Sequence, residues 1–111
     1  MNPKDKEFLE WIVQEMIELG GVSRADLLNS KSRCNQHIAF CRQAAMALAR
    51  EFTDVGTISL GAYFNRHHTS VCHAVDVVKA VLMPADNYAR ARAKLYLAIH
   101  GRLQQRMRVS V

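Results

Sequence analysis

The first stretch of the chain repeats apolar residues with the period of a helix. Between residues 4 and 19 these positions recur at steps of three and four, which places them on one helical face. They are Phe8, Leu9, Ile12, Val13, Met16 and Leu19. Gly20 and Gly21 follow, and glycine suits the left-handed backbone that often ends a helix. The pattern predicts a helix over about residues 4–19.

The next segment joins a short helix to a long one. Ser23 and Asp26 resemble a capping box, with aspartate in the usual place of glutamate, and predict a short helix that runs through Leu28. Residues 29–37 are polar and form an expected basic loop. A long helix is predicted over about residues 38–53. Its inward positions are Ala44, Ala45, Ala47, Leu48 and Phe52. We expect Arg42, Gln43 and Arg50 to stay exposed.

Three further helices are predicted. A short one covers about residues 58–64, a tight turn follows at Asn65 and Arg66, and a second helix spans about 68–82. After Pro84, a final helix covers about 86–107. Its apolar residues recur every fourth position, at Ala91, Leu95, Ile99 and Leu103. The expected fold is all-α, with residues 1–111 forming one domain.

Composition agrees with a small helical protein of basic character. The chain has 111 residues, half of them hydrophobic, and a formal net charge of +5. Residues 1–22 carry two lysines and five acids, whereas residues 85–111 carry six bases and one acid. This polarity favours a polyanionic partner for the middle and end of the chain.

Targeting signals and cysteine usage indicate a cytoplasmic protein. We see no apolar run long enough to span a membrane and no secretory leader. Cys34, Cys41 and Cys72 are odd in number and form no CxxC pair, which suits reduced thiols. No nucleophile, base and orienting acid can be paired, so neither an enzyme nor a cofactor is expected.

Residues 64–74, FNRHHTSVCHA, raise the question of a metal site. His67 and His68 are adjacent and point apart on a helix, and only His68 and Cys72 have i, i+4 spacing. One well-spaced pair is too few for tetrahedral zinc. Cys72 and His73 are therefore expected to pack rather than to bind metal.

The same segment fits a helix-turn-helix. In that unit the second helix enters the major groove with its N-terminus first, so the leading side chains reach base edges. Threonine can hydrogen-bond a base and touch a thymine methyl, and histidine can donate or accept. Residues 67–70, HHTS, are thus expected to read bases.

Several motifs together resemble the C-terminal DNA-binding domain of the bacterial replication initiator DnaA. They are ADLL, a basic stretch, RQ-AMALARE-T, and LG-YF-N-R-HHTSV-HA, over about residues 23–82. The resemblance implies a Trp repressor-like fold, with added N-terminal and C-terminal helices here, and a short duplex ligand called the DnaA box. It implies base contacts by His68, Thr69 and Ser70, and we expect the neighbouring His67 to contact bases as well. It implies backbone contacts by Arg42, Gln43 and Arg50, to which we add Arg66, and minor-groove contact by Arg33 or Lys31.

The sequence departs from the family pattern at several points. His67 stands where the family has aspartate, which caps a helix and accepts hydrogen bonds from bases. The turn is one residue shorter, and the basic loop is about two residues longer. Ser70 lacks a methyl group, Cys41 replaces a proline, and Asp76 and Val77 occupy positions that are often basic.

The chain contains no GxxxxGK[ST] phosphate loop. We therefore expect a protein that binds a specific duplex site and acts by occupancy, either as a transcription regulator or as a competitor at DnaA-box-like sites. The alternative is an interaction module that keeps the fold while its terminal helices bind a protein or a second copy. The chain could also be a fragment of a longer protein.

Overall fold

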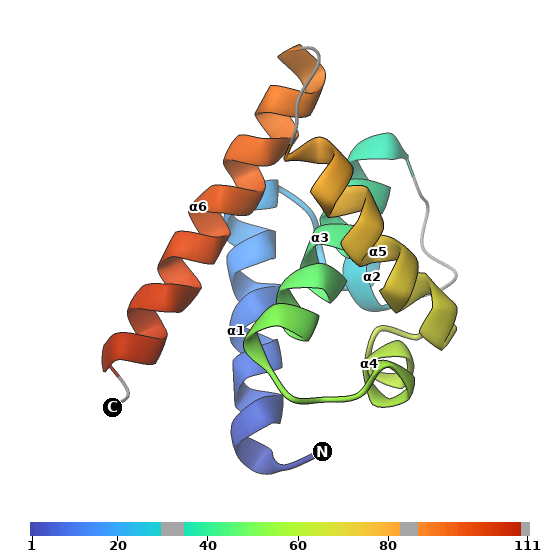
Figure 1. Cartoon of the computed structure of the whole chain (residues 1–111), viewed down its shortest axis with the longest axis vertical. Coiled ribbons are helices and arrows are strands. Elements are labelled where there is room, and N and C mark those ends of the chain that lie inside the picture. The colour runs from blue at the N-terminus through green and yellow to red at the C-terminus, as the bar shows by residue number, and fades with distance from the viewer. Residues whose placement is uncertain (30–34, 83–86, 110–111) are drawn as a thin grey trace.

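The computed structural model describes residues 1–29, 35–82 and 87–109, and all regular elements in these ranges are helices. They are α1 (Pro3–Gly20), α2 (Arg24–Leu28), α3 (Gln36–Phe52), α4 (Thr57–Tyr63), α5 (His68–Val81) and α6 (Asn87–Val109) (Figure 1). The all-α helix-turn-helix bundle is therefore confirmed. No helix in these ranges is both long and apolar enough to cross a membrane.

Local signals account for most helix ends. The Asn2 side chain accepts a hydrogen bond from the backbone N–H of Asp5, and Gly21 ends α1 with a φ of 68°. Ser23 and Asp26 form the predicted capping box at the start of α2. α3 begins at Gln36, two residues before the predicted start, because Asn35 caps it through the N–H of Ile38.

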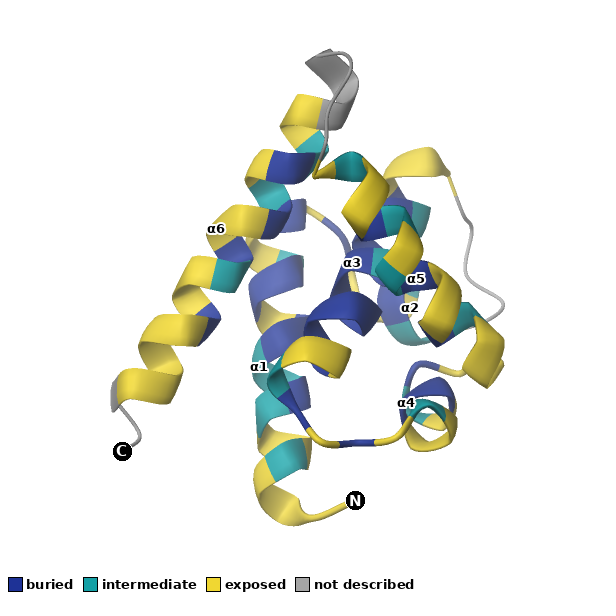
Figure 2. Cartoon of the chain, in the orientation of Figure 1, coloured by how far each residue is buried: buried dark blue, intermediate teal, exposed yellow. Residues whose placement is uncertain are grey.

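Helix α3 forms the centre of the bundle and contacts each of the other five helices. It is buried along most of its length, as Figure 2 shows, because its many alanines allow close approach from several sides. The core around it is filled by apolar side chains from every helix. Its largest fully buried members are Phe40, Phe64, Leu9, Ile12, Met16, Leu27, Leu48, Leu60, Ile99 and Leu103.

The buried face of α6 differs from the predicted one. Ala91 is exposed and Leu95 is half-buried, whereas Ala93, Tyr96, Ile99 and Leu103 are buried. Successive steps of four residues advance about 40° around a helix, so a strict four-residue row leaves any one face within a few steps. The actual face mixes steps of three and four.

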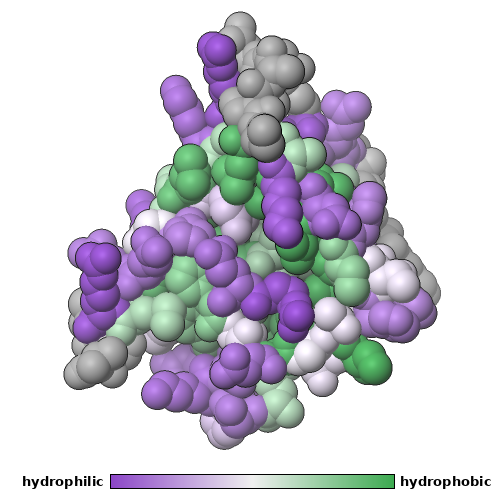
Figure 3. Space-filling view, viewed as in Figure 1, coloured by the Kyte–Doolittle hydropathy of each residue, from purple (hydrophilic) through white to green (hydrophobic). Residues whose placement is uncertain are grey.

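The acidic first helix and the basic last helix pair with each other. Glu15 is 4% exposed, and its carboxylate accepts hydrogen bonds from Arg102 at 2.7 Å and Arg106 at 3.3 Å. Arg102 also lies 3.8 Å from Glu18, and the Arg106 guanidinium lies over the Trp11 ring. Figure 3 shows hydrophilic side chains bordering smaller hydrophobic areas on one face of the molecule. Part of the positive charge of α6 is thus paired with acidic side chains of α1.

Candidate nucleic-acid interface

Helices α4 and α5 are joined by a tight turn, as the sequence predicted. Asn65 adopts the left-handed conformation with a φ of 58°, and the N–H of Arg66 donates to the carbonyl of Gly61 at 2.7 Å. A Cβ atom on Gly61 would lie 2.6 Å from the Arg66 carbonyl oxygen and 3.1 Å from the His68 nitrogen. Gly61 therefore allows the turn to close directly over α4.

The first turn of α5 faces solvent while the helix body is anchored. Val71, Ala74 and Val78 are buried, and α5 packs against α3 and α4. His67, His68 and Thr69 are exposed, and Ser70 is half-buried. The four residues predicted to read bases thus lie together at the leading end of one helix.

His67 caps α5 in the place of an acid. Its Nδ1 accepts a hydrogen bond from the backbone N–H of Thr69 at 3.3 Å and lies 2.8 Å from the Thr69 hydroxyl oxygen. The His67 and His68 rings lie against each other with their centroids 4.2 Å apart and their planes tilted by 35°, so the expectation that they point apart is wrong. These contacts hold the His67 ring in one orientation.

One flank of α5 carries a shallow pocket of about 140 Å³. Its polar lining comes from Arg42, Gln43, Arg66, Ser70 and His73. Four residues that the sequence proposed as DNA contacts are therefore brought to one place, although they come from α3, the turn and α5. His73 joins them on the exposed surface.

Arg42 is buried rather than exposed, which corrects the expectation from its position in α3. Its side chain is 8% exposed, and Nε and Nη2 both donate to the carbonyl oxygen of Asp26, at 3.1 and 2.6 Å. The guanidinium satisfies a carbonyl near the end of α2, where intrahelical partners are lacking. Arg42 thus fixes α2 to α3.

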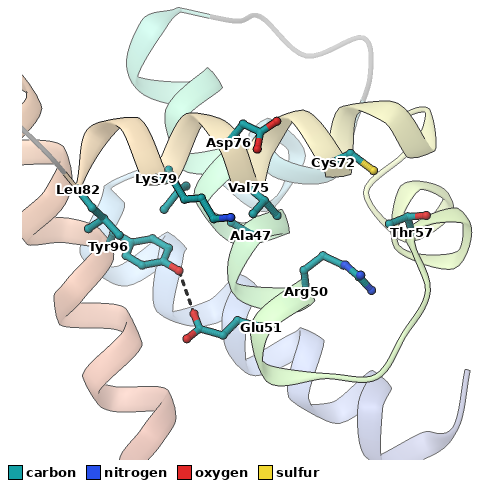
Figure 4. Close-up of a pocket in the computed structure, with 11 residues that line it drawn as sticks. Ala47, Arg50, Glu51, Thr57, Cys72, Val75, Asp76, Lys79, Leu82 and Tyr96 are labelled. Carbon is teal, nitrogen blue, oxygen red and sulfur yellow. Dashed lines mark hydrogen bonds between the residues drawn. The ribbon is translucent and has the colours of Figure 1, made fainter.

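The other flank of α5 forms a larger groove of about 640 Å³ between α3, α5 and α6 (Figure 4). Arg50, Thr57, Cys72 and Lys79 line it, together with the acidic Asp76. Arg50 is exposed, and its Nη1 donates to the Val55 carbonyl at 3.4 Å. This flank therefore places the cationic side chains of Arg50 and Lys79 in the same groove as the carboxylate of Asp76.

Glu51 and Tyr96 close the far end of this groove. Burial, followed by the nearby Glu51 carboxylate, raises the pKa of Tyr96. The Tyr96 hydroxyl donates to Glu51 at 3.1 Å, and His100 Nε2 lies 2.8 Å from the other carboxylate oxygen. The contact joins α6 to the end of α3.

Glu10 connects α1 to the helix-turn-helix. Its carboxylate accepts hydrogen bonds from both Arg24 terminal nitrogens, at 2.8 and 2.9 Å, and from the Tyr63 hydroxyl at 2.6 Å. The Arg24 hydrogen bond, and then that of Tyr63, lowers the pKa of Glu10. Sequence reasoning missed this junction because Glu10 and Tyr63 are far apart along the chain and carry no shared motif.

The histidines and cysteines do not form a metal centre among the described residues, where no group of three possible ligands comes together. Cys72 and His73 are exposed, so the expectation that they pack inward is wrong. Both follow the buried Val71 on the outer side of α5. Cys41 is the buried thiol, and burial raises its pKa to about 11. Lys31 and Arg33 lie outside the described residues.

A short helix, a tight turn and a second helix with an exposed polar leading end define a helix-turn-helix protein. The sequence profile described as "Bacterial dnaA protein helix-turn-helix" matches residues 9–78. The chain therefore belongs to this family of bacterial DnaA helix-turn-helix domains. The match begins within α1, earlier than the motif-rich core over about 23–82, and it supports DNA binding.

Several bacterial relatives of this chain carry the name chromosomal replication initiator protein DnaA. The protein of Caldanaerobacter subterraneus subsp. tengcongensis is 31% identical over 101 residues, covering 91% of this chain and 23% of the relative. That of Desulfatibacillum aliphaticivorans is 48% identical over 52 residues, or 47% of this chain and 11% of the relative. That of Methylobacillus flagellatus is 41% identical over 71 residues, or 63% and 15%. The chain spans less than a quarter of each of these relatives.

Proposed function

We propose that this chain binds a specific duplex DNA site by placing the leading end of α5 in the major groove. The observation that carries the proposal is the set of polar side chains at residues 67–70, three exposed and one half-buried, held on a helix whose opposite face is buried. His67, His68, Thr69 and Ser70 contact base edges in this proposal. Threonine and serine hydroxyls can both donate and accept there.

Residues on both flanks of α5 contact phosphates in the proposal. Gln43 and Arg66 line the smaller pocket, and Arg50 lines the larger groove. Cationic side chains and hydrogen-bond donors therefore border α5 on both sides. Arg42 contributes on the first flank while its guanidinium holds Asp26. We also propose that Arg33 or Lys31 contacts the minor groove, whose narrow A·T-rich form attracts arginine.

The proposed action of this chain is occupancy of its site. Binding would regulate transcription or compete with a replication initiator at DnaA-box-like sequences. The name of these relatives supports the second role, because a shared binding domain would be expected to favour related sites. Neither role requires a reaction by the residues of this chain.

Selection from random duplexes, followed by salt titration, tests the proposal. We expect one enriched sequence and an affinity that falls steeply with salt. Replacing Thr69 by Ala should reduce discrimination at one base step by about 1–3 kcal/mol while leaving binding to random DNA unchanged. Equal losses on selected and random DNA would contradict base reading by Thr69. Absence of both enrichment and salt-dependent binding would leave the interaction module as the better description.

A further inference from the structure

The His67 ring has a defined hydrogen-bonding direction. Both hydrogen bonds that the described residues make with this ring go to Nδ1, one from the Thr69 backbone N–H and one with the Thr69 hydroxyl. The neighbouring His68 ring lies against it, with the centroids 4.2 Å apart and the planes tilted by 35°. The ring is thus held at the end of α5 by Thr69 on one edge and by His68 on its face.

These contacts select one tautomer of neutral histidine. A backbone N–H can only donate, so Nδ1 must offer its lone pair and carries no hydrogen. The ring proton then lies on Nε2, since the hydrogen bond at one ring nitrogen determines the protonation of the other. The Thr69 hydroxyl is compatible with this state, because it can rotate to direct its hydrogen toward the same Nδ1 lone pair.

We propose that His67 is a specificity-determining residue that donates a hydrogen bond from Nε2–H to an acceptor on a base edge. Nε2 lies on the other side of the ring from Thr69, and the side chain is exposed. In the major groove guanine offers O6 and N7, thymine offers O4 and adenine offers N7 beside its amino group, whereas cytosine offers only an amino donor. The inference rests on the proposed function, since it assumes that this end of α5 meets bases.

The expected target therefore has guanine, thymine or adenine opposite His67 and excludes cytosine there. A carboxylate at the same position would also cap the helix, but it could only accept hydrogen bonds, so it would prefer the amino groups of cytosine or adenine. The base class read at this position follows from whether residue 67 donates or accepts.

His67→Asn and His67→Asp form a matched pair that isolates this property. Both side chains are good helix N-caps and nearly equal in size, so both variants should keep the fold. The asparagine carbonyl can accept from the Thr69 N–H while its amide group donates outward, whereas both aspartate oxygens accept. Helix content by circular dichroism checks that all three proteins are folded.

Random-duplex selection with the three proteins is the test. The quantity measured at each position of the enriched site is the ratio of guanine plus thymine, which offer only acceptors there, to cytosine, which offers only a donor. We expect this ratio to be roughly tenfold higher at one position for the wild type and His67→Asn than for His67→Asp. Comparing ratios removes the general loss of affinity that an added negative charge would cause.

The outcomes separate this inference from the proposed function. Enrichment of a site by the wild type, with the same ratio for His67→Asp, would keep the proposed function and overturn donation by His67. A ratio for His67→Asn equal to that for His67→Asp would also overturn it, because size rather than donation would then set the preference. Absence of enrichment with the wild type would overturn both.

Discussion

The α4–α5 unit and the α1–α6 pair use polar residues in opposite ways. Between α1 and α6, the buried Glu15 holds Arg102 and Arg106, so charge contributes to joining two helices. At the leading end of α5, His67, His68 and Thr69 are exposed to solvent. The comparison teaches that positive charge along the sequence does not by itself identify a surface that is free to bind DNA. The strongly basic C-terminal helix directs part of its charge inward, toward the acidic first helix.

The largest expected difference between the two regions is in stability. Leu103 lies on α6 and is fully buried, so Leu103→Ala should lower the free energy of unfolding by about 2–5 kcal/mol. Leu103 lies on α6, away from the residues of α5 that are proposed to contact bases, so the selected DNA site should not change. Chemical denaturation and site selection measure the two effects. Leu97→Ala, at a 56% exposed position of the same helix, is the control and should change stability by less than about 0.5 kcal/mol.

The turn should respond to the addition of one methyl group. Gly61→Ala places a Cβ against the backbone of Arg66 and His68, which should destabilise the fold by about 1–3 kcal/mol and weaken specific DNA binding. Gly101→Ala on α6 meets nothing within 4 Å and should stabilise by about 0.5–1 kcal/mol. Thermal melts and binding titrations of both variants measure this contrast. Unchanged specific binding by Gly61→Ala would argue against a role for the turn in aiming α5.

Substitution of two arginines tests which of the two regions contributes positive charge to DNA binding. Arg50→Ala should weaken binding to all DNA sequences alike and reduce the slope of log K against log salt by about 0.9, the loss of one phosphate contact. Arg102→Ala should leave the slope unchanged, since Arg102 is directed toward Glu15. Fluorescence anisotropy over a range of salt concentrations gives both slopes. Equal decreases would place α6 in the DNA-binding surface.

The smallest expected effect is the acid sensitivity of the Glu10 junction. The pKa of Glu10 is lowered in the folded state from an ordinary value of 4.5, so its contribution to stability is present above that value. It is lost as pH falls through the lowered pKa. Unfolding measured between pH 6 and 3 should therefore show a shallower acid loss for Glu10→Gln than for the wild type. Because the Glu10 side chain is partly exposed, solvent keeps this effect modest. Glu7→Gln, at an exposed position of α1, should follow the wild type.

Short-range features of the fold could be predicted from sequence. The capping box at Ser23 and Asp26, the left-handed Gly21 and the turn at Asn65 each depend on residues within one or two turns of each other. The burial of Arg42 could not be predicted, because its partner is the Asp26 carbonyl on another helix. Any backbone carbonyl is an equally good acceptor, so sequence carries no mark of this choice.

For the candidate site too, the sequence predicts the local features but not those that depend on contacts between side chains or helices. Residues 67–70 could be placed at the leading end of a helix from spacing and motif. The hydrogen bond from Thr69 to His67 could not be, since histidine offers two ring nitrogens and the choice depends on side-chain rotation. The groove beside Arg50 likewise depends on how α6 approaches α5, which no local pattern records.

Helix α3 also fixes the distance between two side chains that lie on opposite flanks of α5. Gln43 lines the pocket on one side of α5 and Arg50 the groove on the other. At about 1.5 Å of rise per residue, the two positions are about 10 Å apart along α3. This distance is close to the major-groove width of about 12 Å. In the proposed complex, α3 would therefore hold Gln43 and Arg50 at a separation that matches the two walls of the major groove.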